Sequence, residues 1–447
     1  MQVSKLDSVG LSDMRLYVPS PGISLNEITE RRSLEDPKLQ RHLERAMRVT
    51  GQKAVRFPDR WQDPATMAAQ ASFDLLMKNP SADPASLRHL AVGTESGLDH
   101  SKPISAYVQG MLQRAGVAIP SSVSSFQSQH ACAGGTMALL SVAGLLSAGG
   151  RAGDSGLVVS TDVARYQSRS TAEVTQGSGA VALHVESSPR LLEIDLAGIG
   201  YHSTDVDDFF RPLGAKVPAV NGSYSMKCYE QSLDAAFVDH CARSGGEPGR
   251  TLRETDFFVL HTPFHSMPEM AMQKLLGNHL GYDADQARAF LAVRGFYEAI
   301  EPLSRIGNMY TSSMYAALAF LLENRFHVMG DAIVGKRILL ASYGSGNTMI
   351  VFSARIAEEA PEVIARWDLG RVFTDARTAS FEEYESWVDG GDSLAPVLDK
   401  SPLPSDSFFL AGIRRDGYRE YGKTDAEEAW MHETEESSDR ELVAATG

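Results

Sequence analysis

Hydrophobic residues follow two spacings along the first half of the chain. Apolar positions at helical spacing predict helices over residues 66–79, 101–116 and 133–150. Short apolar runs flanked by glycine and serine predict buried strands over residues 87–94, 156–163 and 180–186. Strands separated by helices of this length favour a mostly parallel sheet that helices cover on both faces.

The second half follows the same pattern. An apolar strand within residues 255–264 is expected to end at His261, and a helix is expected over residues 267–280. A loop then leads into an apolar helix within 305–325, and two strands joined by a Gly-Ser-Gly-Asn turn are expected within 337–356. Two halves built alike indicate an internal duplication, although no clean sequence repeat is visible.

These patterns divide the chain into an N-terminal half (1–190), a C-terminal half (191–356) and an extension (357–447). Within the extension the apolar periodicity weakens, and the stretches DGGDS and SPLPSDS are typical of loops. The last part, TDAEEAWMHETEESSDRE, is rich in acids and indicates a solvated, partly disordered tail.

Composition and charge exclude several classes of partner. The chain has 42 Lys and Arg against 57 Asp and Glu, a net charge of −15, which repels nucleic acids and anionic membranes. Its three cysteines form no CxxC pair, so a reducing compartment is expected, with no disulfide framework and no metal site. The N-terminus has no secretion-signal pattern, and the stretch 115–150, which lacks charges, is interpreted as containing a buried helix. We therefore expect a cytoplasmic enzyme that needs neither nucleic acid nor membrane.

Cys132, in the sequence HACAGG, lies just before the apolar helix predicted over 133–150. A helix N-terminus stabilises a thiolate and its free amides can hold an oxyanion, so the residue is a candidate nucleophile. The alternative is an inert buried thiol. His261 ends a buried strand and Asn308 lies in a loop before a helix, the positions at which α/β sheets place their sites. A hydrogen-bonded histidine and a helix-capping asparagine are the structural alternatives.

Glu95 discriminates between the possible reactions. It follows a predicted strand and lies among small residues, in VGTESGLDHSK. An exposed surface carboxylate is the default interpretation. A carboxylate that faces Cys132 could instead remove a proton from an acyl group carried on the sulfur, and burial would raise its pKa for that task.

These stretches together resemble the hydroxymethylglutaryl-CoA (HMG-CoA) synthase family of the thiolase superfamily, including its polyketide β-branching members. The resemblance is carried, in family order, by TESGLDHSK, HACAGGT, STDVARY, DFFRP, NGSYSMKCY, HTPF, GNMYTSS and SYGSG. It implies an α/β fold of five layers, αβαβα, with internal duplication, and a homodimer. DFFRP and TESGLDHSK distinguish this family from ketoacyl synthase III, which shares the cysteine, histidine and asparagine.

The resemblance also implies a mechanism. Cys132 accepts an acyl group from a thioester, and Glu95 takes a proton from the acyl methyl group. The enolate attacks the β-ketone of an acetoacetyl thioester, which His261 holds, and water frees the product. The backbone amides of Cys132 and Ser345 are expected to hold an oxyanion. No cofactor is expected, since CoA or phosphopantetheine thioesters are the substrates. The residues expected to bind them are Asp162, Tyr166, Thr175, Asp208, Phe209, Asn308, Tyr310 and Ser345.

The sequence departs from the family pattern in two places. Ala133 stands where an aromatic residue commonly follows the nucleophile, which could open the pocket wall. Ser266 and Met270 stand where animal enzymes carry lysines that meet the phosphates of CoA, and Lys274 is the nearest lysine. Charge-assisted contacts hold phosphates, so their loss weakens the case for CoA.

Acyl carrier proteins carry the same pantetheine arm, but an acidic carrier needs a basic patch. The candidate cations for such a patch are Arg211, Lys216, Lys227 and Arg243. The carrier, the acyl donor and the pathway, mevalonate synthesis or polyketide β-branching, therefore stay open. Two other functions are weighed: a ketoacyl synthase III-like acyltransferase, which needs no Glu95, and a catalytically silent thiolase-fold scaffold.

Overall fold

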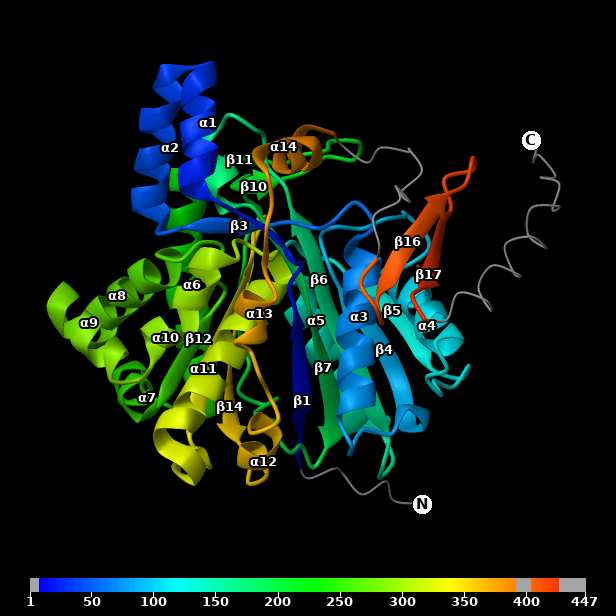
Figure 1. Cartoon of the computed structure of the whole chain (residues 1–447). Coiled ribbons are helices and arrows are strands. Elements are labelled where there is room, and N and C mark those ends of the chain that lie inside the picture. The colour runs from blue at the N-terminus through cyan, green and yellow to red at the C-terminus, as the bar shows by residue number, and fades with distance from the viewer. Residues whose placement is uncertain (1–7, 391–402, 426–447) are drawn as a thin grey trace.

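One large sheet forms the centre of the molecule (Figure 1). The computed structural model describes residues 8–390 and 403–425. The strands follow the order β12-β13-β14-β8-β1-β7-β6-β4-β5, and β9 pairs with β14. Their bounds are β1 Val9–Tyr17, β4 Leu87–Gly93, β5 Ser124–Ser128, β6 Ser155–Ala164, β7 Gly177–Ser187, β8 Leu192–Ile194, β9 Gly200–Ser203, β12 Phe257–Leu260, β13 Arg337–Gly344 and β14 Thr348–Ile356.

The sheet is mixed, so the prediction of a mostly parallel sheet is wrong. Parallel pairing joins β4 to β5, β4 to β6, and β12 to β13. β7 runs antiparallel to both β6 and β1, and β14 runs antiparallel to β13, β8 and β9. The reason lies in the connections. Only a few residues join β13 to β14, a link too short for the crossover that parallel strands need.

The two halves repeat one arrangement. The N-terminal half has the order β1-β7-β6-β4-β5, and the C-terminal half has β8-β14-β13-β12. In each half the second strand, β7 or β14, runs antiparallel to both of its neighbours. β8 pairs with both β14 and β1 and so joins the halves. The chain also repeats a detail of its backbone. Ala131 and Tyr310 both have positive φ, 40° and 44°, and each lies three residues before a long helix. This repetition supports the internal duplication.

Strand alternation in the N-terminal half divides the interior into two cores. Ala91 and Val158 face one core, whereas their neighbours Leu90 and Leu157 face the other. The first core contains α5 (Gly134–Gly149), and the second contains α3 (Pro64–Lys78) and α4 (Ile104–Arg114). Helices therefore cover both faces, as predicted.

The stretch Ala131–Gly149, which contains α5, has a mean hydropathy of 1.6 and is long enough to cross a membrane by length and composition alone, among the described residues. Half of it is buried inside the molecule, and α5 packs on β4, β6 and β7. We interpret it as a core helix.

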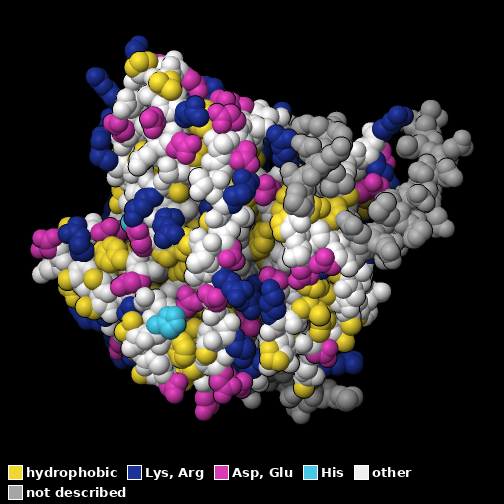
Figure 2. All heavy atoms as spheres, in the orientation of Figure 1, with side chains coloured by type: hydrophobic (Ala, Val, Ile, Leu, Met, Phe, Trp, Pro, Cys, Tyr) yellow, Lys and Arg dark blue, Asp and Glu magenta, His cyan; other side chains and the backbone are white. Residues whose placement is uncertain are grey.

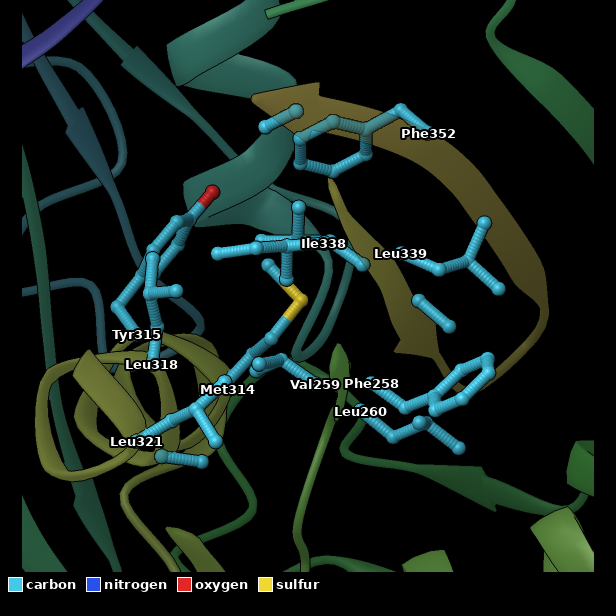
Figure 3. Close-up of a cluster of buried hydrophobic side chains, with 14 of the residues drawn as sticks. Phe258, Val259, Leu260, Met314, Tyr315, Leu318, Leu321, Ile338, Leu339 and Phe352 are labelled. Carbon is cyan, nitrogen blue, oxygen red and sulfur yellow. The ribbon is translucent and has the colours of Figure 1, made fainter. Parts of the chain in front are cut away.

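The C-terminal half packs in the same way. α11 (Ser313–Met329) contributes Met314, Leu318 and Leu321 to a cluster with side chains of β12 and β13, shown in Figure 3. α6 (Gly222–Ser244) and α8 (Met267–Leu280) lie toward the left of α11 in Figure 1, where α6 packs on β9 and β14. The Thr136 and Tyr315 hydroxyls, 2.9 Å apart, link α5 to α11 in the middle layer. The other helices are α7 Pro248–Glu254, α9 Ala284–Ala292, α10 Phe296–Ile300, α12 Ala360–Ile364 and α13 Arg371–Thr374.

A cap sits above the sheet in Figure 1. It has its own core, which includes Leu43, Phe57 and Tyr384. It is built from distant segments: α1 Leu25–Glu35, α2 Pro37–Thr50, β2 Pro21–Ser24, β3 Ala54–Arg56, β15 Arg377–Thr378 and α14 Phe381–Gly390.

The extension is more ordered than its sequence pattern suggests. Its α14 closes the cap, and the hairpin of β16 (Phe408–Ile413) and β17 (Arg419–Lys423) buries Phe408 in the core beside α3. These short elements are stabilised by residues far away in the sequence, so they need no periodicity of their own. The acidic run predicted as a tail lies, from residue 426 on, outside the described residues.

Candidate active site

A cavity of about 670 Å³ opens between the cap and the carboxyl ends of the central strands. It is lined by residues from both halves of the sheet and from the cap. Of the predicted site residues, the following line it: Cys132, Tyr166, Thr175, Phe209, His261, Asn308, Tyr310 and Ser345. Glu95 joins the site through its contact with the cysteine, whereas Asp162 and Asp208 do not line the cavity.

The Cys132 thiol donates a hydrogen bond to Glu95 Oε1 at 3.0 Å. Two features of the backbone produce this pairing. Gly93 ends β4 directly against the start of α5, where a β-carbon would lie 2.3 Å from the Gly135 Cα atom. Ala131, with φ of 40°, turns the chain so that Cys132 precedes the helix, a conformation that costs about 1–3 kcal/mol for a non-glycine residue. Backbone strain of this kind concentrates at functional sites.

Asp162 holds the loop that carries Glu95. This fully buried carboxylate accepts hydrogen bonds from the backbone amides of Glu95 and Ser96, each at 3.0 Å, and from the Thr94 hydroxyl at 2.9 Å. Its other oxygen accepts from the Thr311 amide at 3.0 Å, in the other half of the molecule. Asp162 positions the loop and does not reach the cavity, because it is fully buried and both of its oxygens accept hydrogen bonds from the protein.

Burial controls the protonation of the pair. Desolvation, and next the nearby Asp162 carboxylate, raise the pKa of Glu95 to about 8. Desolvation and then the Glu95 charge raise the pKa of the Cys132 thiol well above its usual value. The resting site therefore holds a neutral thiol beside a carboxyl group of high proton affinity, which is what a base for carbon acids requires.

His261 is the first residue after β12 and is 2% exposed. Burial lowers its pKa to about 3, so the imidazole is neutral and offers one N–H donor. The Tyr229 hydroxyl donates to the His261 backbone oxygen at 2.9 Å and fixes the strand end. A neutral imidazole on the cavity wall can bind a carbonyl oxygen without adding charge.

Asn308 also lines the cavity and is buried. Its Oδ1 accepts from the Tyr310 amide at 2.8 Å and from the Ser313 hydroxyl at 3.1 Å, so it also fixes the start of α11. Its Nδ2 donates to the Tyr166 hydroxyl at 3.3 Å. The rings of Tyr166, Phe209 and Tyr310 meet edge to face, with centroids 6.0–6.4 Å apart, and form an apolar wall beside the cysteine.

Asp208 holds the SYGSG loop in place, as Asp162 holds the loop that carries Glu95. It is fully buried and accepts from the Tyr343 hydroxyl at 2.8 Å and the Gly346 amide at 2.9 Å. The same loop packs on the chain on either side of the nucleophile, since a β-carbon on Gly344 would lie 2.4 Å from the His130 oxygen and 3.0 Å from the Ala133 amide nitrogen. Asp208 is thus a positioning residue and does not contact the cavity.

The structure places two further features that the sequence analysis singled out. Ala133 is fully buried beneath the SYGSG loop and does not line the cavity. The four candidate cations do not all lie together. Arg211 turns inward and donates to the Glu95 backbone oxygen, and Lys227 and Arg243 lie sixteen positions apart on α6, about 24 Å at helical rise.

The sequence analysis missed the cap side of the cavity. Residues of α2 line it, together with residues of α6 and of the segment around the start of α8. They are His42, Arg45, Ala46, Val49, Thr50, Met226, Tyr229, Phe264 and Met267. The repeated basic positions in PKLQRHLERAMRVT could have drawn attention to α2. Within the described ranges, no three His, Cys, Asp or Glu side chains are grouped to hold a metal ion.

Comparisons with known proteins identify the family of the chain. The family model described as hydroxymethylglutaryl-coenzyme A synthase N terminal matches residues 5–189, and its C-terminal counterpart matches 192–300 and 294–419. An HMG-CoA synthase of Haloferax volcanii is 28% identical over 93% of this chain and 99% of its own length. One of Enterococcus faecalis is 29% identical over 91% and 97%.

Solved structures extend the likeness to the fold. MvaS in complex with 3-hydroxy-3-methylglutaryl coenzyme A is 32% identical, with a TM-score of 0.81 over 94% of this chain and 99% of that one. The curacin pathway HMG synthase in complex with holo donor-ACP has a TM-score of 0.81 at 23% identity, over 94% and 100%, and so shares the fold. With both family models covering nearly the whole chain, the protein belongs to the hydroxymethylglutaryl-CoA synthase family and is a condensing acyltransferase of thiolase fold.

Proposed function

We propose that Cys132, Glu95 and His261 carry out the condensation of an acyl thioester, usually acetyl, with an acetoacetyl or related β-ketoacyl thioester. The product is a 3-hydroxy-3-methylglutaryl-type thioester. The observation that carries this proposal is the 3.0 Å contact between Cys132 Sγ and Glu95 Oε1, inside a buried site that His261 and Asn308 also line.

In the first step the Cys132 sulfur attacks the acyl carbonyl carbon. A new carbon–sulfur bond forms, the bond to the carrier's sulfur breaks, and the proton of the Cys132 thiol ends on the released carrier thiol. Glu95 accepts the hydrogen bond of that thiol and is the nearest group able to relay the proton. The oxyanion of this step is assigned to the Cys132 and Ser345 amides.

In the second step Glu95 removes a proton from the methyl carbon of the acyl group. The resulting enolate carbon attacks the β-carbonyl of the acceptor, and a carbon–carbon bond forms. Glu95 then returns its proton to the new alkoxide. A carboxyl group with a pKa of about 8 suits both transfers, because it takes a proton more readily than an ordinary glutamate and still releases it near neutral pH.

The remaining groups orient the acceptor. The neutral His261 imidazole donates to an acceptor carbonyl, and Asn308 is assigned to the acceptor thioester. The aromatic wall excludes water while the enolate exists, since Tyr166 and Tyr310 are almost completely buried. Water then attacks the Cys132 thioester and releases the product. These steps need no further cofactor.

Mass spectrometry of the Cys132 peptide tests the proposal. Incubation with acetyl-CoA or an acetyl carrier protein is expected to give an acetyl adduct on this peptide, and addition of the acetoacetyl thioester is expected to convert it to product. A protein that forms no adduct with either donor would be a silent scaffold. A Glu95→Ala variant that still condenses would indicate a ketoacyl synthase III-like reaction.

A homodimer is part of the proposal. β5 is the edge strand of the large sheet, and α5 beside it presents apolar side chains outward, with Leu145 47% exposed. An open strand edge next to an exposed apolar helix favours pairing with a second copy.

A cytoplasmic location is also part of the proposal. The three cysteines are free, which supports it. The mevalonate and polyketide pathways both remain compatible with this reaction.

A further inference from the structure

We propose that the basic face of α2, formed by Lys38, Arg41, Arg45 and Arg48, is a docking surface for an acidic acyl carrier protein. The inference rests on the proposed function and names the carrier that delivers its substrates. The pantetheine arm of the docked carrier enters the cavity beside this helix.

The four cations form one continuous stripe. Their spacing of three, four and three residues places them on one side of α2, where all four are exposed. From Lys38 to Arg48 the stripe extends about 15 Å at helical rise. No ion pair joins any of the four to a carboxylate within residues 8–390 and 403–425, and the single acid within the helix, Glu44, accepts from Gln40 at 3.0 Å. Figure 2 shows Lys and Arg side chains along the outer edge of the protrusion that α1 and α2 form in Figure 1.

The stripe meets the cavity at its C-terminal end. His42, Arg45, Ala46 and Val49 line the cavity from α2. Arg45 therefore belongs both to the basic face and to the entrance. A phosphate that stands at the outer end of a pantetheine arm can contact Arg45, while the surface that carries the arm meets the rest of the stripe.

α2 also occupies the place where the resemblance expected the phosphate-binding lysines. The Ser266 amide donates to the Thr50 oxygen at 3.0 Å, and the Ser266 hydroxyl donates to the Val49 oxygen. The end of α2 is thus fixed onto the start of α8. The nearest lysine of α8, Lys274, is paired with Glu230 at 2.9 Å. α2 therefore places unpaired positive charge at this entrance where α8 does not.

The extent and exposure of the stripe favour a macromolecular partner. Lys38, Arg41 and Arg48 stand on the exposed helix surface outside the cavity, where a flexible nucleotide bound inside would contact only part of the stripe. Val49, 49% exposed, and Val220, 44% exposed, add apolar surface at the rim, and both line the entrance. A basic stripe bordered by apolar side chains is complementary to an acidic protein surface. The chain as a whole has a net charge of −15, so this stripe is a local region of opposite charge that can steer an acidic partner to the entrance.

The test compares three acetyl donors for Cys132: an acetyl carrier protein, acetyl-CoA and an acetyl-pantetheine thioester with no protein. The variant is Lys38→Glu/Arg41→Glu, which reverses two exposed charges away from the cavity. The matched control is Arg151→Glu/Arg253→Glu, which makes the same charge change at exposed positions outside the cap. Thermal unfolding checks that both variants fold as the wild type does.

We expect the α2 variant to raise KM for the acetyl carrier protein by about tenfold or more, with little change in kcat, because charge pairs at an interface act on encounter and affinity. The effect should shrink at high salt. Acylation by acetyl-CoA and by acetyl-pantetheine should change by less than about threefold, and the control should resemble the wild type.

An equal loss with acetyl-CoA would overturn the inference, because the stripe would then bind nucleotide phosphates. Unchanged KM for the carrier protein would overturn it as well. Failure of the proposed function is distinguishable, since it would abolish acylation of the wild type by all three donors.

Discussion

At the scale of single residues, the site depends on one buried carboxyl group next to one thiol. Burial raises the pKa of both groups, and the Glu95 charge raises the pKa of the thiol further, whereas the hydrogen bond from the thiol lowers the pKa of Glu95. Glu95 is 8% exposed and lies beside a second buried carboxylate, Asp162, so its charged form is costly. The position of these groups, and not the residue types alone, produces a base of suitable strength.

Replacement of Glu95 by Gln should separate the two half-reactions. We expect Glu95→Gln to lose condensation by about 10²–10⁴-fold, because general-base catalysis is removed. Acylation of Cys132 should persist, since the Glu95 charge raises the pKa of the thiol and its removal lowers that pKa. Stopped-flow condensation assays and the pH dependence of Cys132 alkylation measure the two effects. Glu193→Gln, at an exposed position on β8, is the control.

The pH dependence of condensation follows from the raised pKa of Glu95. The base must be deprotonated, so activity should rise with pH and level off above about 8. Acylation of Cys132 removes a hydrogen bond that lowers this pKa, so the acyl-enzyme should titrate no lower. Single-turnover rates of the preformed acetyl-enzyme between pH 5 and 10 would measure the midpoint. A midpoint near the usual glutamate value of 4.5 would contradict a desolvated base.

At the scale of elements, the cap holds one wall of the cavity through a buried ion pair. Arg32 of α1 and Glu173 of the short helix η2 (Thr171–Thr175) are both fully buried and lie 2.9 Å apart. The Tyr384 hydroxyl of α14 donates to the same carboxylate at 3.0 Å. η2 contributes Thr171 and Thr175 to the cavity lining, so three distant segments fix this wall together.

Removal of one partner of this ion pair should lower stability and weaken substrate binding. Arg32→Met is expected to lower the free energy of unfolding by about 3–5 kcal/mol, because Glu173 would stay buried without a countercharge. It should also raise KM, since η2 lines the cavity. Arg31→Met is the matched control: Arg31 pairs with Glu382 at an exposed site, and its loss should cost at most about 1 kcal/mol. Urea unfolding with steady-state kinetics distinguishes the two, and equal effects would contradict this role for the buried pair.

At the scale of the whole molecule, two similar halves each supply part of the site. Strand β4 leads to Glu95 and the equivalent strand β12 leads to His261, while α5 and α11 begin beside Cys132 and Asn308. The site exists only where the two halves meet. Its nucleophile loop also lies between β5 and α5, the elements proposed to pair with a second copy.

If the proposed dimer forms through that surface, disruption of the surface should dissociate it. Leu145→Glu places a charge on the exposed face of α5 and is expected to give a monomer with reduced activity, as measured by sedimentation and by Cys132 acylation. Val328→Glu, on α11 at a residue 65% exposed, is the control and should stay dimeric. A monomeric wild-type protein would overturn the proposed dimer. A dimeric Leu145→Glu variant would locate the interface elsewhere.

The sequence by itself determined the main elements and most of the site. Strand and helix periodicity predicted α3, α5, β4, β6 and β12, because the apolar residues of each element recur at regular spacing within one short stretch of the chain. The positions of Cys132, His261 and Asn308 next to those elements predicted a common edge of the sheet. All three line one cavity.

Only the tertiary structure decided which of the candidates touch that cavity and what surrounds it. Asp162 and Asp208 are turned inward because loops from both halves close around them, and Ala133 is covered by the SYGSG loop. The cap assembles α2 and α14, which are more than 300 residues apart in the chain. Such contacts depend on how the chain returns on itself, and no local pattern of apolar and polar residues records that.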